Sequence, residues 1–245
     1  RMIQRPIGPV AVFGASNFPL AFSTAGGDTA AALAAGCPVV VKGHSAHPGT
    51  GEIVAEAILA ALQKCNVHPG VFSLIQGGNR RVGEALVSHP MIKAVGFTGS
   101  LAGGRALFNL CAARPEPIPF FGELGSVNPM FLLPAAMSAR GAQIAQGWAA
   151  SLTMGAGQFC TNPGIAVVMA DQAQALAAAT IAALASVGAQ VMLTAGIAQA
   201  YVQGRDRIAG APGVQSLLTQ VCDRRQATPQ LFMVRGADWL ADHDL

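Results

Sequence analysis

The sequence has little charge and few aromatic residues. Of its 245 residues only 11% are charged and 6% are aromatic, and 15 lysines and arginines nearly balance 12 aspartates and glutamates. No run of basic residues with interleaved aromatics occurs, so binding to nucleic acid is not expected. The hydrophobic content of 52% instead indicates a globular protein with a sizeable core and one or two domains.

Paired cysteines are also missing. The five cysteines form no CxxC pair and stand at Cys37, Cys65, Cys111, Cys160 and Cys222. Neither a disulfide framework nor a zinc site is therefore predicted, and free thiols indicate a reducing compartment, so we expect a cytoplasmic protein. His44 and His47 lie in a Pro/Gly-rich stretch without a cysteine or carboxylate beside them. We expect exposed loop histidines there and no metal site.

Charge is absent altogether from residues 173–204, a stretch longer than the ~20 residues that span a bilayer. Four glutamines interrupt the stretch, which is unusual for a membrane span. The pattern favours an Ala-rich helix over residues 172–185, a turn at Gly188, a short strand over residues 190–193 and another helix. No membrane partner is expected.

Short apolar runs alternate with longer helical patterns. The predicted strands are residues 9–14, 38–42, 71–76, 94–98 and 118–121. The predicted helices between them are residues 22–35, 50–65, 80–88 and 101–112. This βαβ rhythm predicts an α/β protein with a Rossmann-like, doubly wound parallel sheet. Ligands of such sheets bind at the carboxyl ends of the strands.

The chemistry of the sequence changes after Gly122. The segment Glu-Leu-Gly-Ser-Val-Asn-Pro, residues 123–129, leads into a second αβ series that starts at Met130. We therefore predict two domains, residues 1–124 and residues 125–245. An apolar run over residues 230–235 gives the last predicted strand of the second domain.

Cys160 is the first candidate catalytic residue. It sits in Met-Gly-Ala-Gly-Gln-Phe-Cys-Thr-Asn-Pro-Gly, residues 154–164, where small residues leave room for a substrate carbonyl beside the sulfur. Glycines before and after it let backbone amides point at a developing oxyanion, and a nucleophilic thiolate needs such a polar setting. From the local sequence alone, a buried structural thiol remains the favoured alternative.

Three further segments carry candidate site residues at predicted strand ends. Glu123 can act as a general base on water, although a salt-bridged surface acid explains it as well. Asn17, in the turn after the first strand, can donate its side-chain amide, or it is a turn-forming Asn. Ser100 is a good N-cap for the helix over residues 101–112, and a helix N-terminus beside Gly99 is a ready phosphate site.

Together these segments resemble the aldehyde dehydrogenase superfamily. Five motifs occur in its order and rough spacing: Asn17-Phe18-Pro19, Lys42-Gly43-His44-Ser45, Phe97-Thr98-Gly99-Ser100, Glu123-Leu124-Gly125 and Gly157-Gln158-Phe159-Cys160. The resemblance covers essentially the whole chain. It favours a functional role for each candidate residue over the structural alternatives given above. It implies the aldehyde dehydrogenase fold, with an NAD(P)-binding domain in residues 1–124 and part of the catalytic domain in residues 125–245.

The resemblance also implies a mechanism. Cys160 attacks the aldehyde, and the Asn17 amide and the Cys160 backbone N–H hold the oxyanion. Hydride passes to the nicotinamide, and Glu123 deprotonates the water that hydrolyses the thioester to a carboxylic acid. The presence of Glu123 argues against the acylating, coenzyme-A-dependent relatives.

The same resemblance implies a cofactor site. Lys42 matches the lysine that hydrogen-bonds the adenosine ribose, Gly99 and Ser100 match the pair beside the pyrophosphate, and Ser16 joins the cofactor-binding set. Ser45 replaces an acid common in NAD-preferring members and Arg80 supplies a guanidinium, so NADP is expected, with NAD as the alternative. The stretch from residue 42 to residue 50 looks most like NADP-using bacterial members, including those acting on α-ketoglutarate semialdehyde.

The ends of the chain, Arg1 and Leu245, do not read as natural termini. Members of the family are longer, so we expect a fragment that need not be active by itself, of a full-length protein that forms a homo-oligomer. A truncated nucleotide-binding module without turnover is one alternative function. An NAD-preferring aldehyde dehydrogenase of other substrate range is the second.

Overall fold

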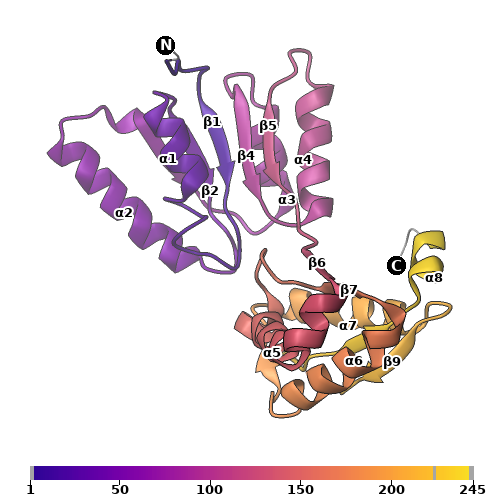
Figure 1. Ribbon diagram of the computed structural model, residues 1–245. Helices are drawn as coiled ribbons and strands as arrows, with labels where there is room; N and C mark the ends of the chain where they lie inside the picture. Colours follow the sequence, from indigo (N-terminus) through magenta and orange to yellow (C-terminus); the bar gives the residue numbers. More distant parts are fainter. Residues whose placement is uncertain (1–2, 223–224, 243–245) are drawn as a thin grey trace. The chain divides into compact units, whose positions relative to one another are not determined.

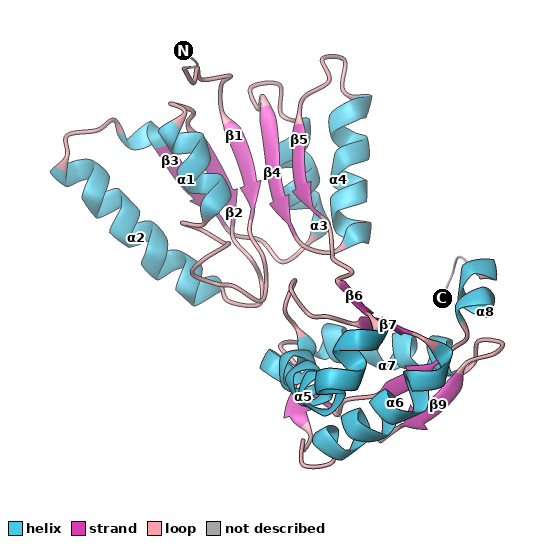
Figure 2. Ribbon diagram, viewed as in Figure 1, coloured by secondary structure: helices cyan, strands magenta, loops and turns pink. Residues whose placement is uncertain are grey.

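The computed structural model describes residues 3–222 and 225–242. It divides into two compact units, Arg1–Gly125 and Ser126–Leu245. The expected α/β class is confirmed, and Figure 2 shows helices and strands in both units. The division falls one residue after the predicted boundary, while the roles assigned to the two domains stay predictions.

The first unit is built from alternating strands and helices (Figure 1). Its strands are β1 (Val10–Phe13), β2 (Val39–Lys42), β3 (Phe72–Ile75), β4 (Ala94–Thr98) and β5 (Phe120–Glu123). Its helices are α1 (Gly27–Ala34), α2 (Pro48–Lys64), the short 3-10 helix η1 (Pro69–Val71), α3 (Arg80–Ser88) and α4 (Leu101–Ala113). All five strands are parallel in the order β3-β2-β1-β4-β5, so the predicted doubly wound sheet is confirmed.

Both faces of this sheet are covered, because successive side chains of a strand point to opposite sides. Val10 and Val12 belong to one apolar cluster with residues of α1 and α2. Ala11 and Phe13 belong to a second cluster with residues of α3 and α4. Burial on both faces explains why β1 and β2 read as nearly continuous apolar runs.

One helix and one strand of this unit do not lie where the sequence predicts them. Helix α1 begins at Gly27, not at residue 22, because Phe22 closes a turn by donating its N–H to the Phe18 carbonyl at 3.2 Å. Strand β5 covers Phe120–Glu123 instead of residues 118–121. Its register is set by β4 alone, which pairs Thr98 with Glu123, and Ile118 is buried just before the strand begins.

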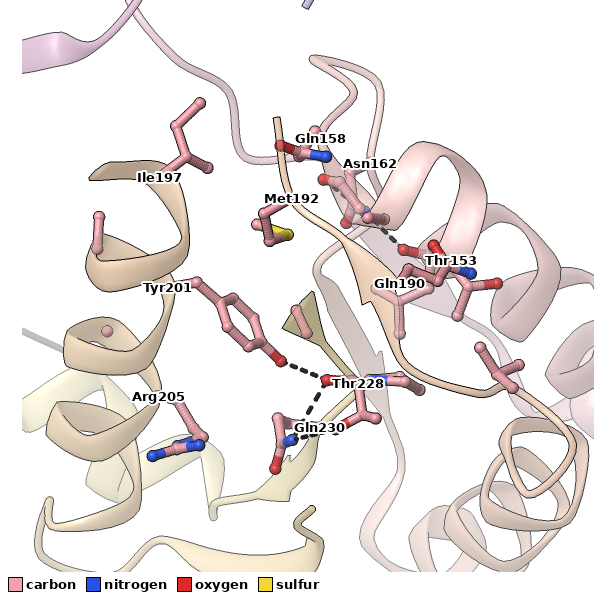
Figure 3. A pocket seen from close by; sticks show the side chains of 18 of the residues that line it. Thr153, Gln158, Asn162, Gln190, Met192, Ile197, Tyr201, Arg205, Thr228 and Gln230 are labelled. Carbon is pink, nitrogen blue, oxygen red and sulfur yellow. Dashed lines mark hydrogen bonds between the residues drawn. The ribbon is translucent and has the colours of Figure 1, made fainter. Parts of the chain in front are cut away.

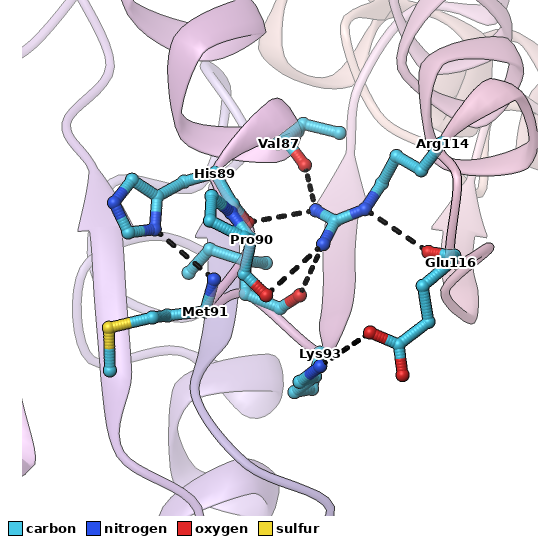
Figure 4. Close-up of polar contacts among 8 residues, drawn as sticks. Val87, His89, Pro90, Met91, Lys93, Arg114 and Glu116 are labelled. Carbon is cyan, nitrogen blue, oxygen red and sulfur yellow. Dashed lines mark hydrogen bonds and ion pairs between the residues drawn. The ribbon is translucent and has the colours of Figure 1, made fainter.

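Arg114 fixes the chain where it enters β4 (Figure 4). Its guanidinium donates to the carbonyl oxygen of Val87 in the last turn of α3 and to those of three residues between α3 and β4, namely His89, Pro90 and Ile92. Nearby, Lys93 forms an ion pair with Glu116 at 2.8 Å. One side chain thereby satisfies several backbone acceptors of the connection between α3 and β4, which holds the start of β4 in place.

The second unit has smaller sheets. Its elements are β6 (Pro129–Leu132), α5 (Pro134–Thr153), the 3-10 turn η2 (Met154–Gly157), β7 (Ile165–Val168), α6 (Ala170–Leu184), β8 (Gln190–Val191), α7 (Ala195–Ala209), β9 (Gln215–Leu218), β10 (Gln226–Ala227), β11 (Leu231–Met233) and α8 (Gly236–Ala241). Strands β6 and β7 pair in parallel, whereas β8 with β10 and β9 with β11 pair antiparallel.

Helices α5 and α6 pack on the β6–β7 pair. Met137, Trp148 and Leu176 are buried in a cluster with the strand residues Met130 and Ala166. The predicted helix, turn, short strand and helix between residues 172 and 204 correspond to α6, β8 and α7. Within residues 3–222 and 225–242, no helix is both long and apolar enough to cross a bilayer.

Candidate active site

The candidate residues of the first unit all lie at one edge of its sheet. Because the five strands are parallel, their carboxyl ends meet at the same edge, where ligands of doubly wound sheets bind. This edge carries, in order along the chain, Ser16, Asn17, Lys42, Ser45, Arg80, Gly99, Ser100 and Glu123. The structure therefore brings these eight residues to a common side of one unit.

Asn17 lies in a tightly folded loop after β1. Gly14 has no room for a side chain, because a Cβ atom there would collide with the backbone of Ser23. The Ala15 N–H donates to the Phe22 carbonyl at 2.6 Å, and the Phe18 and Phe22 rings meet edge to face at 5.4 Å between centroids. The chain thus folds back on itself around Asn17, which holds the loop in one shape.

The two histidines after β2 are not the exposed loop histidines that the sequence predicts. Both are half-buried, and their rings stack at 5.3 Å between centroids. Burial, with smaller contributions from His47 and Lys42, lowers the pKa of His44 to about 4. Burial also lowers the pKa of Lys42. Among the described residues, no cluster of three or more potential metal ligands occurs.

Ser45 and Arg80 follow neighbouring strands. Strand β2 pairs with β3 so that Lys42 lies opposite Ile75, and both loops that follow leave the sheet at adjacent points. Gln76 joins the loop after β3 to the start of α2, because its amide donates to the Pro48 carbonyl at 3.3 Å and to the Glu52 carboxylate at 3.0 Å. Arg80 is exposed at the first position of α3, where its guanidinium is open to a ligand.

The ends of β4 and β5 are joined by backbone hydrogen bonding. The Gly99 N–H donates to the Glu123 carbonyl at 3.0 Å. Ser100 caps α4 as predicted, since its hydroxyl accepts from the Gly103 N–H at 3.2 Å. The Glu123 side chain is exposed, and no salt bridge involving it is found in the described part of the chain. Glu123 is thus a surface acid without the ion pair that the alternative expects, and its role as a base stays a prediction.

Cys160 belongs to the second unit and is exposed, which excludes the buried structural thiol. It lies in a turn closed by the Asn162 N–H donating to the Phe159 carbonyl at 3.1 Å. The approach to this turn is unusual, because Gly155, Ala156 and Gly157 all have left-handed φ angles of 57°, 57° and 73°. A left-handed φ at a residue other than glycine, as at Ala156, is found mainly where function requires a fixed backbone.

Side chains that the sequence reasoning missed hold this turn. Asn128 donates its amide to the carbonyls of Cys160 at 2.9 Å and Asn162 at 3.0 Å, and Ser126 donates to the same Cys160 carbonyl. Asn162 donates to the Leu152 carbonyl at 2.9 Å. The backbone of the thiol-bearing residue is thereby fixed by the segment just before β6, while its side chain stays accessible.

A cavity of about 530 Å³ adjoins this turn within the second unit (Figure 3). Gln158 lines it and also fixes its wall, since its carbonyl oxygen accepts from the Leu193 N–H at 2.9 Å and its amide donates to the Gly155 carbonyl at 3.0 Å. Across the cavity, the Tyr201 hydroxyl donates to the Thr228 carbonyl at 2.6 Å. Nothing in the local sequence predicts this cavity, because its walls come from distant segments.

A protein-family model matches most of this chain. The model, described as aldehyde dehydrogenase family, matches residues 1–197, which include every candidate residue named above. The chain belongs to the aldehyde dehydrogenase family. The resemblance stated from the five motifs is therefore confirmed.

Curated members of the aldehyde dehydrogenase family include close relatives of this chain. It is 57% identical over 221 residues to alpha-ketoglutaric semialdehyde dehydrogenase 2 of Azospirillum brasilense, covering 89% of the chain and 42% of the relative. It is 50% identical over 235 residues to alpha-ketoglutaric semialdehyde dehydrogenase of Acinetobacter baylyi, covering 95% and 44%. The chain thus spans less than half the length of these relatives.

Solved aldehyde dehydrogenase structures share the fold. Glyceraldehyde-3-phosphate dehydrogenase GapN of Methanocaldococcus jannaschii, in complex with NADP, aligns with a TM-score of 0.78 at 22% identity, covering 95% of this chain and 51% of that one. An NAD-dependent benzaldehyde dehydrogenase of Corynebacterium glutamicum aligns with a TM-score of 0.74 at 24% identity, covering 93% and 50%. The family uses NAD or NADP, and these two structures illustrate both.

Proposed function

We propose that the full-length protein oxidises an aldehyde to a carboxylic acid with NADP, through a thioester on Cys160. The observation that carries this proposal is the exposed thiol on a turn whose carbonyl is anchored by Asn128 at 2.9 Å. A nucleophile needs an accessible sulfur on a backbone that does not move. Most cysteines serve packing and are buried, and this one is not.

In the proposed first step, the Cys160 thiolate attacks the carbonyl carbon and forms a C–S bond, and the carbonyl oxygen becomes an oxyanion. The Asn17 side-chain amide and the Cys160 backbone N–H donate hydrogen bonds to that oxygen. Donors fixed before the reaction stabilise developing charge without reorganisation. When bound, NADP accepts the hydride that leaves the carbon, so the carbon is oxidised to a thioester.

In the proposed second step, Glu123 takes a proton from water, and the hydroxide attacks the thioester carbon. The C–S bond breaks, Cys160 leaves as thiolate and the carboxylic acid is released. An exposed carboxylate at the carboxyl end of a parallel strand is placed where a ligand of this fold binds. General-base catalysis of this kind contributes about 10²–10⁴-fold.

The residues at the sheet edge suit a phosphorylated nucleotide. The edge offers hydrogen-bond donors that carry no negative charge, namely Lys42, Ser45 and Arg80. Ser100 caps the 13-residue helix α4, whose N-terminus favours phosphate. Lys42 would bind the adenosine ribose, and Ser16, Gly99 and Ser100 would lie beside the pyrophosphate. Glu52, one of the two acids on α2, accepts a hydrogen bond from Gln76.

The proposed substrate is α-ketoglutarate semialdehyde. Two curated relatives at 57% and 50% identity carry that activity in their names. The five cysteines are all free, which supports a cytoplasmic location as part of the same proposal. Family likeness alone supports a homo-oligomer of the full-length protein.

The proposal is tested by mixing the full-length protein with NADP and α-ketoglutarate semialdehyde and following reduced cofactor and carboxylic acid together. Equal amounts of the two products are expected. Iodoacetamide should alkylate Cys160 selectively, as mass spectrometry of the digest can show, and aldehyde should prevent the alkylation. Absence of turnover with any of a panel of aldehydes, together with unprotected alkylation, would favour a nucleotide-binding module without catalysis.

Replacing Arg80 by alanine is expected to raise KM for NADP by roughly tenfold or more while KM for NAD barely changes. A 2′-phosphate needs a cation and the absence of a repelling carboxylate, and a charge-assisted contact is worth about 1.5–3 kcal/mol. Ser45 meets the second need and Arg80 the first. Steady-state kinetics with each cofactor measure the effect.

The matched control is Arg81→Ala, because Arg81 is the next residue of α3 and is equally exposed. It should leave both constants unchanged. Equal loss with NAD and NADP in the Arg80 variant would show that Arg80 supports the fold and not the phosphate.

A further inference from the structure

The side chain of His47 is directed away from the helix that it precedes. His47 occupies the N-cap position of α2, yet its side chain makes no capping hydrogen bond there. Instead its Nε2 atom lies 3.0 Å from the carbonyl oxygen of Ala15, a residue 32 positions earlier in the chain. The ring is therefore used for a contact with a distant segment and not for capping its own helix.

The hydrogen-bonding pattern defines the tautomer of this ring. A carbonyl oxygen only accepts, so the Nε2 atom of His47 carries the proton and donates it to Ala15. The Nδ1 atom is buried, and no hydrogen-bond partner for it is found among the described residues. A proton on Nδ1 would be buried without an acceptor. The form with the proton on Nε2 alone is therefore the one that fits.

A second imidazole fixes the plane of the first. The His44 ring stacks on His47 with an angle of 26° between the planes. His44 is itself held, because its Nδ1 atom accepts from the Ala46 N–H at 3.1 Å. The direction of the His47 N–H is consequently determined by packing as well as by its own hydrogen bond.

The acceptor of this hydrogen bond starts the segment that carries Asn17. Ala15 is 2% exposed, and its N–H is already bonded to the Phe22 carbonyl at 2.6 Å. His47 binds the opposite end of the same residue, so both polar groups of Ala15 are fixed. Ser16 and Asn17 follow at once, which makes the position of Asn17 depend on a peptide held by His47.

We propose that His47 is a positioning residue that holds the loop after β1 through Ala15 and thereby places the Asn17 amide for the oxyanion. This inference rests on the proposed function for its effect on catalysis, while the contact itself does not. A displacement of about 1 Å in a catalytic group costs on the order of 10²-fold in rate. His47 reaches the loop from the next strand connection, and Asn17 alone touches substrate.

The test uses His47→Phe in the full-length protein, since phenylalanine keeps an aromatic ring against His44 but cannot donate. We expect kcat to fall by roughly 10–100-fold, with KM for NADP changed less than about threefold. His47→Gln, whose amide nitrogen reaches near the Nε2 position, should recover most of kcat. His47→Asn is too short to reach Ala15 and should resemble His47→Phe, which keeps the test valid if the phenylalanine variant does not fold.

A double-mutant cycle with Asn17→Ala separates an effect on the position of Asn17 from a general loss of activity. If His47 acts through Asn17, then His47→Phe should cost almost nothing further on the Asn17→Ala background. Full additivity of the two losses would overturn the proposal, and so would a raised KM for NADP with unchanged kcat. His68→Phe is the control, because His68 is exposed and its ring accepts a hydrogen bond from the Gly70 N–H in its own turn.

A measurement that does not depend on catalysis separates the contact between His47 and the loop from the proposed oxyanion role of Asn17. Amide hydrogen exchange across residues 15–22, measured by mass spectrometry, should be faster in His47→Phe than in wild type and in His68→Phe. Unchanged exchange would overturn the contact. If Asn17→Ala proves fully active while exchange responds to His47, the oxyanion role in the proposed function fails and the loop contact stands.

Discussion

Replacing Cys160 by alanine in the full-length protein is expected to reduce turnover to below roughly a thousandth of wild type. In the proposed mechanism the thiol forms the covalent bond, and alanine offers no atom that can replace it. Cofactor affinity should hardly change, because no proposed cofactor residue belongs to the turn of Cys160. Steady-state assays give the loss of turnover, and the rise of melting temperature with NADP gives the affinity.

Cys65→Ala is the matched control, since Cys65 is also exposed but lies directly after α2. It should keep wild-type turnover and should not remove the iodoacetamide-sensitive site. Residual turnover of Cys160→Ala above roughly a thousandth of wild type would contradict the nucleophile assignment. A lost response to NADP in the same variant would show instead that the substitution disturbs the fold.

Features decided by neighbours in sequence could be predicted. Helix α3 and strand β4 begin and end where the apolar patterns do, and Ser100 caps α4 through a contact three residues away. The parallel sheet followed from the alternation of short apolar runs and helices. Because the strands are parallel, Asn17, Lys42 and Glu123 then lie at one edge.

Features decided by contacts between distant segments could not be predicted from the sequence. The histidine prediction was wrong because His47 is held by a carbonyl 32 residues away, which no local pattern reveals. Strand β5 was misplaced because its register is set by β4. The anchors of the Cys160 turn were missed for the same reason, since Asn128 lies 32 residues before the carbonyl it binds. In the sequence, only the Asn-Pro pair at residues 128–129 could have pointed to Asn128 as such an anchor.

The three proposed catalytic residues lie in very different local backbone settings. Cys160 sits behind a run of left-handed residues, Asn17 in a loop that folds back on itself, and Glu123 at the end of an edge strand. Each lies at the margin of regular structure, where a rigid scaffold positions a loop residue. Sequence periodicity is weakest at such places, so recognition of these residues depended on the five motifs taken together.

Replacing Glu123 by glutamine is expected to leave the hydride step nearly intact and to slow thioester hydrolysis by about 10²–10⁴-fold. The backbone of Glu123 is fixed by the Gly99 N–H at 3.0 Å, and the side chain is exposed. Glutamine therefore keeps shape and removes only the base. Rapid mixing should show a burst of reduced cofactor, close to one per active site, followed by little steady turnover.

Hydroxylamine sharpens this test because it attacks a thioester without needing a protein base. Added to Glu123→Gln, it should restore steady release of reduced cofactor and convert the acyl group to a hydroxamate, leaving Cys160 free. Glu84→Gln, an exposed acid on α3, should behave as wild type with or without hydroxylamine. Equal loss of the burst and the steady rate, with no recovery by hydroxylamine, would show that Glu123 acts before the thioester forms or supports the structure alone.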